Sequence, residues 1–256
     1  MNDITASLAG RVAIITGAGQ GIGRVFARAF AAAGAVTVIA ERNRERGDAV
    51  AAEIVADGGR AQAIATDVAD ADSVNAMAKA VEDEFGRVDI LINNAAIFST
   101  LEMRPFDQIP LAEWEAVLRV NVTGAFLCAR AVVVPMRRAG WGRIINMASG
   151  AVTLGRPNYL HYTTSKAALE GMTRSLAREL GPHGITANAI LPGATFTEIE
   201  RKTVTPEQKE RIVAMQCIAR PEEPRDLVGT ALFLASDAAS FLTGQAITVD
   251  GGATHP

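Results

Sequence analysis

A tyrosine and a lysine, four residues apart, are the side chains of this chain best suited to proton transfer. Apolar residues recur at helical spacing after Tyr162 and Lys166, so both side chains are predicted to share one face of one helix. A fixed ammonium one helical turn away favours the phenolate, which lowers the pKa of a phenol from its usual value of about 10. Tyr162 could then serve as a general acid or base near neutral pH.

Ser149 is expected to approach the same place from a different element. It follows the apolar residues 144–147, which are predicted to form a strand, and open parallel α/β sheets bind their ligands at the carboxyl ends of strands. Its hydroxyl could hold a substrate oxygen against the phenol. A Tyr-x-x-x-Lys pair by itself is also common on half-exposed helices that have no catalytic role, so the interpretation depends on the rest of the chain.

Composition narrows the class of protein. The chain has 256 residues, of which 49% are apolar, so it can bury a substantial core. Its net charge of −3 gives no sign of the basic face that nucleic acid or an acidic membrane surface requires. Cys128 and Cys217 are far apart, without a Cys-x-x-Cys or histidine cluster, which predicts two reduced core thiols, no disulfide and no metal site.

The N-terminus and the hydropathy pattern indicate where in the cell the protein is expected. No basic segment followed by an apolar one opens the chain, so no secretory signal is visible. The most apolar window, 125–136, contains an arginine and a proline and is too short to span a bilayer. We therefore expect a soluble cytoplasmic protein with no membrane partner.

Short β-branched apolar runs alternate with alanine-rich helical stretches from one end of the chain to the other. The predicted strands are residues 12–16, 36–40, 63–66, 90–93, 143–147, 186–191 and 246–249. The predicted helices are residues 24–33, 44–56, 71–85, 111–137, 159–180 and 225–236. This alternation, with continuously apolar strands, predicts an α/β fold: a Rossmann-type doubly wound parallel sheet of about seven strands with helices on both faces.

No linker or repeat interrupts the alternation, so residues 1–256 are expected to form a single domain. Two segments, 97–110 and 194–217, do not fit the alternation. Both follow predicted strand ends, where long irregular connections commonly bind ligands, and we interpret the second as a substrate lid around 194–217. Its charged residues are expected to form a solvated outer surface. They are Glu198, Glu200, Arg201, Lys202, Glu207, Lys209, Glu210 and Arg211.

The first predicted strand runs into a glycine-rich turn, Thr16 to Gly23, and then into a helix. Glycines let the backbone approach a pyrophosphate, whose charge the amides at a helix start attract. The same turn could also serve only the close packing of helix on strand. Glu41 ends the second strand, 18 residues after Gly23, where a carboxylate can bind an adenosine ribose and repel a 2′-phosphate. This favours NAD over NADP, and Arg42 partly offsets the repulsion.

Together these residues make the sequence resemble the short-chain dehydrogenase/reductase family, in the subgroup of 3-oxoacyl carrier-protein reductases and bacterial secondary-alcohol dehydrogenases. The resemblance covers almost the whole chain and rests on six motifs in the family's order. They are Thr16 to Gly23; Asp67-Val68; Asn93 to Ala96; the tetrad Asn121, Ser149, Tyr162 and Lys166; Pro192-Gly193 with Thr195 and Thr197; and the C-terminal pair 242–245 and 249–252. The intervals of 28 and 13 residues between the first three tetrad members agree with the family spacing. Ala96 stands where the family has glycine, which affects only the local turn.

The resemblance implies how the tetrad works. Ser149 and Tyr162 would hydrogen-bond the substrate oxygen, Tyr162 would transfer the proton, and hydride would move between the substrate carbon and a nicotinamide ring. Lys166 would lower the pKa of Tyr162 and bind the nicotinamide ribose, and Asn121 would hold a water that connects Lys166 with solvent. The residues alone also allow Asn121 to be a buried asparagine that braces a helix kink next to Gly124.

The same resemblance implies a cofactor site and an assembly. The cofactor-binding residues would be Gly17, Gln20, Gly21, Ile22, Gly23, Glu41, Asp67, Val68, Asn94, Ala95, Tyr162, Lys166, Pro192, Gly193, Thr195 and Thr197. The C-terminal pair is similar to the signature of tetrameric members, so a homotetramer is expected.

The main hypothesis is an NAD-dependent oxidoreductase acting on a secondary alcohol or ketone, such as a sugar- or aryl-derived one. One alternative is an NADP-dependent 3-oxoacyl thioester reductase. A second, of another class, is a catalytically inactive dinucleotide-binding sensor or scaffold, against which the complete tetrad argues. His161 is expected to pack beside the site, about 100° round the helix from Tyr162. Residues that could line a substrate pocket or belong to ordinary core are Phe98, Val152, Leu154, Phe196 and Met215.

Overall fold

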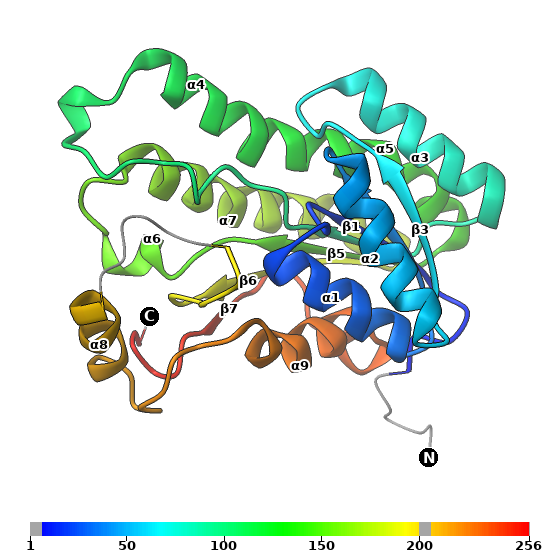
Figure 1. Ribbon diagram of the computed structural model, residues 1–256. Coiled ribbons are helices and arrows are strands. Elements are labelled where there is room, and N and C mark those ends of the chain that lie inside the picture. The colour runs from blue at the N-terminus through cyan, green and yellow to red at the C-terminus, as the bar shows by residue number, and fades with distance from the viewer. Residues whose placement is uncertain (1–6, 200–205, 256) are drawn as a thin grey trace.

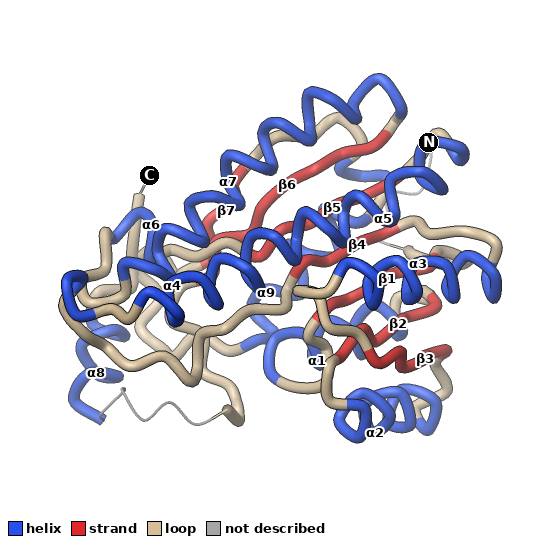
Figure 2. The backbone as a smooth tube through the Cα atoms, turned by 90° about the horizontal axis from the view of Figure 1, so that it is seen from above, coloured by secondary structure: helices blue, strands red, loops and turns tan. Residues whose placement is uncertain are grey.

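The computed structural model, described here for residues 7–199 and 206–255, is built around one parallel sheet of seven strands in the order β3-β2-β1-β4-β5-β6-β7 (Figures 1 and 2). The strands are β1 (Val12–Thr16), β2 (Val36–Glu41), β3 (Arg60–Ala65), β4 (Ile90–Asn93), β5 (Gly142–Met147), β6 (Ile185–Pro192) and β7 (Ala246–Val249). The strand order reverses between β1 and β4, and ligands bind at such a switch point in open α/β sheets. The predicted fold class is confirmed.

The helices form a layer on each face of the sheet (Figure 1). They are α1 (Gly21–Ala32), α2 (Arg44–Ala56), α3 (Ala71–Phe85), α4 (Leu111–Leu118), α5 (Gly124–Ala139), α6 (Ala151–Leu154), α7 (Leu160–Leu180), α8 (Pro206–Ala214) and α9 (Pro224–Ala235). Figure 1 shows α1 and α9 below the sheet and α3, α5 and α7 above it. Both views place α6 and α8 together at one end of the sheet.

Alternate residues of each central strand serve the two helix layers. In β1, Ala13 and Ile15 pack into the core under α1 and α9, whereas Val12 and Ile14 pack into the core under α3, α5 and α7. Successive side chains of a strand point to opposite faces, so a strand covered on both sides is apolar at most positions. This explains the continuously apolar runs that identified the strands.

The structure differs from the predicted elements in several places. β3 begins at Arg60 and is partly exposed, because it is an edge strand. The polar residues in its first half are the reason why the predicted strand began later, at residue 63. α1 begins at Gly21, so the glycine-rich turn itself supplies the first helical turn. The short helices α6 and α8 were not predicted, since four and nine residues carry little periodicity.

The predicted helix 111–137 is α4 and α5 joined by a π-helical turn, Arg119–Thr123. Together they form a 29-residue helix, Leu111–Ala139, that is long and apolar enough by length and composition to cross a membrane. The expectation that this segment is too short is therefore wrong for the assembled helix. Within its most apolar window, 44% is buried inside the protein, and α5 packs against α3 and β4. Core helices that pack on a sheet have the same length and composition.

The two cysteines lie in different environments. Cys128 is buried in α5, and burial raises the pKa of its thiol to about 12. Cys217 is exposed, so the prediction of a second core thiol is wrong. It follows α8 in a loop near the C-terminus, where its Sγ lies 3.3 Å from the carbonyl oxygen of Gly252.

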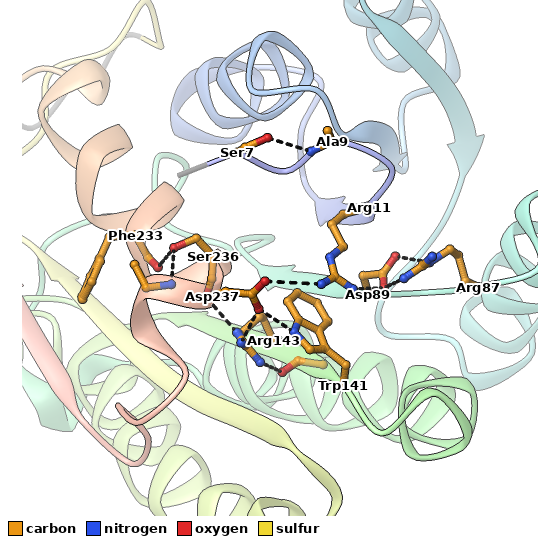
Figure 3. A network of polar contacts seen from close by, with 12 residues as sticks. Ser7, Ala9, Arg11, Arg87, Asp89, Trp141, Arg143, Phe233, Ser236 and Asp237 are labelled. Carbon is orange, nitrogen blue, oxygen red and sulfur yellow. Dashed lines mark hydrogen bonds and ion pairs between the residues drawn. The ribbon is translucent and has the colours of Figure 1, made fainter. Parts of the chain in front are cut away.

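A network of charged and aromatic side chains joins the segments at the amino ends of the strands (Figure 3). The carboxylate of Asp89 is completely buried and accepts hydrogen bonds from the Val12 amide at 2.8 Å and from Arg87 at 2.6 and 2.7 Å. Arg11 reaches the same carboxylate at 3.3 Å and stacks over the ring of Trp141. The network therefore connects β1 with β4 and β5 at the amino ends of the strands.

Candidate active site

A cavity of about 840 Å³ opens at the carboxyl ends of the strands. Its wall runs from the glycine-rich turn after β1, past the ends of β2, β4 and β5, to α7, α8 and the loop after β6. All of the predicted cofactor-binding residues except Gly23 lie on this wall, as do Ser149, Tyr162 and Lys166 of the tetrad. Segments far apart in sequence thus contribute to one cavity, as expected for a switch point between β1 and β4.

Glycine is required in the turn for two different reasons. Gly17 has a φ of +64°, and a Cβ there would lie 2.8 Å from Ala95 Cα, so a side chain is excluded by conformation and by space. A Cβ on Gly23 would collide with the Gly17 carbonyl oxygen and lie 2.8 Å from Ala18 Cα. Gly23 is therefore needed for packing α1 on its own turn, and its contact with the cofactor stays a prediction.

Hydrogen bonds hold the ends of β1 and β4 together beneath the turn. The Thr16 hydroxyl accepts from the amides of Asn94 and Ala95, both at 3.0 Å. The Asn94 side chain donates to the carbonyl oxygens of Thr16 at 2.9 Å and of Gly17 at 3.1 Å. These bonds fix the floor of the cavity before any ligand arrives.

Glu41 lines the cavity, and two backbone amides fix its carboxylate there. Its two oxygens accept hydrogen bonds from the amides of Gly19 at 3.1 Å and Asn43 at 3.0 Å. Arg46, which the sequence did not single out, donates to Gln20 at 2.6 Å beside it. The end of the cavity next to β2 therefore holds a fixed carboxylate flanked by arginine.

Tyr162 and Lys166 project from α7 into the buried end of the cavity. The Lys166 ammonium donates to the carbonyl oxygen of Met147, the last residue of β5, at 2.6 Å and lies 5.6 Å from the centre of the Tyr162 ring. Burial lowers the pKa of Lys166 to about 8. The Tyr162 ring packs against Phe98, with 4.5 Å between ring centres. Ser149, two residues beyond β5, accepts a hydrogen bond from the Ala151 amide at 3.2 Å.

Asn121 lies in the π-helical turn and does not reach the cavity wall. Its side-chain oxygen accepts from the Ile97 amide at 2.8 Å, and its side-chain nitrogen donates to Ser165 at 3.0 Å. The Ser165 hydroxyl in turn donates to the Tyr162 carbonyl oxygen at 2.7 Å. Asn121 therefore joins the loop after β4 to the helical turn that carries Tyr162, which supports the bracing interpretation. Its contact with a water stays a prediction.

The structure also shows the positions of His161 and of the predicted pocket residues. His161 is fully buried, with Nε2 at 3.3 Å from Glu113, and packs beside the site as expected. Of the proposed pocket residues, Phe98, Leu154 and Met215 line the cavity, while Val152 and Phe196 do not. Arg156 and Arg211 also line it, and no motif had pointed to either as a wall residue.

The segment 194–217, predicted to be a lid, is only partly a solvated surface in its described residues. Glu198 is exposed but accepts a hydrogen bond from the Gly21 amide at 2.8 Å, at the start of α1. Lys209 stacks over the ring of Phe196, with 4.7 Å between the ammonium and the ring centre. Glu200, Arg201 and Lys202 lie outside the described residues. Glu198 could not be recognised from the sequence, because its partner is 177 residues away.

Lys166→Met is expected to raise the free energy of unfolding of the cofactor-free protein at pH 7 by about 1–2 kcal/mol. A lysine whose folded pKa lies near 8, below the 10.5 of the unfolded chain, destabilises the fold below pH 8, and this effect fades as the pH rises to 10.5. Loss of the bond to Met147 offsets part of the gain. Urea unfolding at pH 7 and pH 9.5 measures the change in the free energy of unfolding. A variant less stable than wild type at pH 7 would contradict the destabilising effect of Lys166.

Comparison with known proteins agrees with the geometry. A family model described as enoyl-(acyl carrier protein) reductase matches residues 17–254. The 3-oxoacyl-[acyl-carrier-protein] reductase of Synechocystis is 41% identical over 249 residues, which are 96% of this chain and 98% of that protein.

Solved structures share the whole fold. A protein of Beutenbergia cavernae, described as a candidate NAD(P)-dependent gluconate 5-dehydrogenase with bound NADP at low occupancy, is 39% identical, with a TM-score of 0.90 over 96% of this chain and 98% of that one. The 3-ketoacyl-(acyl-carrier-protein) reductase of Brucella melitensis complexed with NADH is 35% identical, with a TM-score of 0.90 over 97% and 100% of the chains. The present chain therefore belongs to the short-chain dehydrogenase/reductase family, nicotinamide-dependent oxidoreductases that act on CH–OH or keto groups.

Proposed function

We propose that this protein is an NAD-dependent oxidoreductase that transfers a hydride between nicotinamide and a secondary alcohol or ketone, such as a sugar- or aryl-derived one. The observation that carries this proposal is that Ser149, Tyr162 and Lys166 lie on the same cavity wall as the glycine-rich turn and Glu41. Residues 1–256 would act as one catalytic domain, with residues around 194–217 as the lid.

The residues present fit a dinucleotide. The tight turn after β1 depends on Gly17 and Gly23, which leave no room for side chains, and the start of α1 offers an amide that already binds an anionic group, the Glu198 carboxylate. When bound, a nicotinamide cofactor supplies the hydride acceptor or donor. The loop after β6, with Gly193 and Thr195, lies on the cavity wall and would face its carboxamide.

The protein's own part in the reaction is proton transfer and charge stabilisation. The hydroxyls of Ser149 and Tyr162 would hydrogen-bond the substrate oxygen, on which charge develops as hydride leaves or arrives. Tyr162 would take or give the proton. Lys166 would favour the phenolate by its charge, and its bond to Met147 fixes the ammonium beside the ring. Asn121 would support the turn that holds Tyr162.

Steady-state kinetics with the two reduced cofactors test the proposed preference for NAD. We expect kcat/KM for NADH to exceed that for NADPH by about tenfold or more, because the Glu41 carboxylate repels a 2′-phosphate. Glu41→Ala should reduce the ratio, since Arg42 and Arg46 then lie near the phosphate unopposed. A clear NADPH preference in the wild-type protein would overturn the assignment.

A second candidate is an NADP-dependent 3-oxoacyl thioester reductase. The name of the Synechocystis relative supports it, as does the presence of Arg42 and Arg46 beside Glu41. The name of the Beutenbergia relative supports a sugar-derived substrate instead. A panel of polyols, sugar acids, aryl alcohols and 3-oxoacyl thioesters, assayed with both cofactors, separates these candidates. Tight NADH binding without turnover of any member of the panel would favour a sensor or scaffold.

We also propose a cytoplasmic homotetramer. Phe126 and Val134 on α5 and Phe241 before β7 are exposed apolar side chains that subunit contacts would cover. Light scattering tests the assembly, since a tetramer has four times the chain mass of 26.9 kDa.

Glu198→Ala is expected to tighten NADH binding by about two- to fivefold. The Glu198 carboxylate bonds the Gly21 amide at the helix start where the pyrophosphate is expected, so the cofactor must displace it. Fluorescence titration with NADH measures the change, with Glu210→Ala on the exposed side of α8 as a control of equal charge. Weaker binding by the Glu198 variant would show that the contact assists the cofactor.

A further inference from the structure

Glu222 is a buried carboxyl group directly behind the loop that follows β6. Its residue is 4% exposed, and Oε1 accepts a hydrogen bond of 2.6 Å from the Thr195 hydroxyl. Its backbone carbonyl accepts from the Phe196 amide at 2.8 Å. One residue therefore holds two successive positions of the loop, although it precedes α9 and lies 27 residues further along the chain.

The Glu222 side chain also occupies the space beside Gly193. A Cβ at this position would lie 2.5 Å from Glu222 Oε2 and 2.8 Å from Asp250 Cβ. Gly193 and Thr195 line the cavity, whereas Glu222 does not. The carboxyl group is thus separated from the cavity only by the loop, whose close approach requires glycine.

No cation in the described part of the chain forms an ion pair with Glu222. The carboxylates that act on it, Asp250 and Asp226, are engaged elsewhere: Asp250 with the amides of Gly252, Ala253 and Thr254, and Asp226 with Arg220. Arg220 also interacts with the charge of Glu222, while its guanidinium is paired with Asp226. Burial raises the pKa of Glu222 to about 7 and these two carboxylates add to the rise, against the opposing effects of Thr195 and the Gly193 backbone.

We propose that Glu222 is a positioning residue for the nicotinamide: it fixes Gly193 and Thr195 and places negative charge behind them that favours the oxidised, cationic ring over the reduced one. This inference rests on the proposed function. A carboxylate in a poorly solvated site acts on a nearby cation much more strongly than it would in water. The reduced ring is neutral and gains nothing from it.

Ionisation of Glu222 also sets the direction of the Thr195 hydrogen bond. A hydroxyl has a single proton, so Thr195 can only accept from a ligand while it donates to the ionised carboxylate. When Glu222 is protonated, it can donate to Thr195 instead, which releases the hydroxyl proton for another acceptor. The two states of Glu222 thus offer different partners to a carboxamide.

The test compares the affinities for oxidised and reduced cofactor across pH. Binding of NAD⁺ should lower the pKa of Glu222, so the Kd for NAD⁺ should fall by up to about tenfold between pH 6 and 8, while the Kd for NADH changes little. Calorimetry in two buffers of different ionisation enthalpy should show proton release when NAD⁺ binds near pH 6.5. At pH 6.5 the ammonium of Lys166 stays protonated, because its pKa is about 8, so its deprotonation gives a separate signal at higher pH.

Glu222→Gln keeps the size of the side chain and removes its titration. It should bind NAD⁺ with a Kd that no longer depends on pH between 6 and 7.5 and without proton release, whereas the exposed-residue control Glu84→Gln should behave as wild type. Glu222→Asp, which still titrates, should keep the pH dependence with weaker binding. The wild-type calorimetry remains decisive if either variant fails to fold.

The outcomes separate this inference from the function on which it rests. Equal pH dependence for NAD⁺ and NADH, no proton release by the wild-type protein, or an unchanged profile in Glu222→Gln would each overturn the role of Glu222 while leaving the enzyme assignment intact. Failure of the wild-type protein to bind either cofactor at any pH would instead overturn the proposed function and this inference with it.

Discussion

Replacing Tyr162 by phenylalanine is expected to lower kcat by about 10²–10⁴-fold, the usual contribution of a positioned acid or base. The phenylalanine ring preserves packing against Phe98, so the fold and the cavity should remain. The Kd for NADH should change little, because the turn after β1, Glu41 and the loop after β6 are untouched. Single-turnover kinetics and fluorescence titration measure the two quantities separately.

The chain offers a matched control for this variant. Tyr159, its only other tyrosine, is 2% exposed and lies 6.4 Å from the Tyr162 ring centre, but it is not on the cavity wall. Tyr159→Phe removes a hydroxyl from the same aromatic cluster and should keep kcat near the wild-type value. Equal losses in both variants, or near wild-type turnover by Tyr162→Phe, would show that Tyr162 is not the proton donor.

Asp89→Ala is expected to lower the free energy of unfolding by about 3–5 kcal/mol, the largest effect on stability that we predict. It removes a completely buried carboxylate and leaves the Val12 amide without its partner at the start of β1. It also leaves Arg87 and Arg11 without their common counterion (Figure 3). Urea unfolding followed by circular dichroism measures the loss.

Asp83→Ala is the control for the Asp89 variant. Asp83 also pairs with a cation, Lys79, at 2.6 Å, but both side chains are exposed on α3, so a much smaller loss is expected. The Asp89 network lies at the amino ends of the strands and the cavity at their carboxyl ends. Folded molecules of the Asp89 variant should therefore retain the wild-type kcat. Similar losses of stability in the two variants would show that burial of the Asp89 carboxylate is not the reason for its large effect.

The sequence was most informative where the pattern of one segment determines its environment. β1 and β4 have the predicted bounds, because both faces of a central strand are covered and most of its residues are apolar. β3 was shifted because an edge strand has one side exposed and tolerates Arg60 and Gln62. The π-helical turn was not predicted, since five residues are too few to reveal a one-residue shift in hydrophobic periodicity.

The candidate site was predictable to the extent that it is built from motifs. Ser149, Tyr162 and Lys166 share one cavity wall as expected, whereas Asn121 lies behind it. Glu198 and Glu222 escaped notice because their partners, Gly21 and Thr195, are brought to them only by the tertiary fold. A charged side chain in a loop is usually solvated, and no local pattern shows that Glu222 is buried or that Glu198 bonds a distant amide.

The wide turn at Arg119–Thr123 makes this enzyme sensitive to chain length at one point. A regular turn needs one residue fewer, so deleting Val122 would let the helix continue without interruption while α5 kept its orientation on the sheet. The residues within the turn would change position, and Asn121 would lose its register with Ser165. A shortened turn should therefore preserve the fold but release the loop after β4 from the helical turn that carries Tyr162.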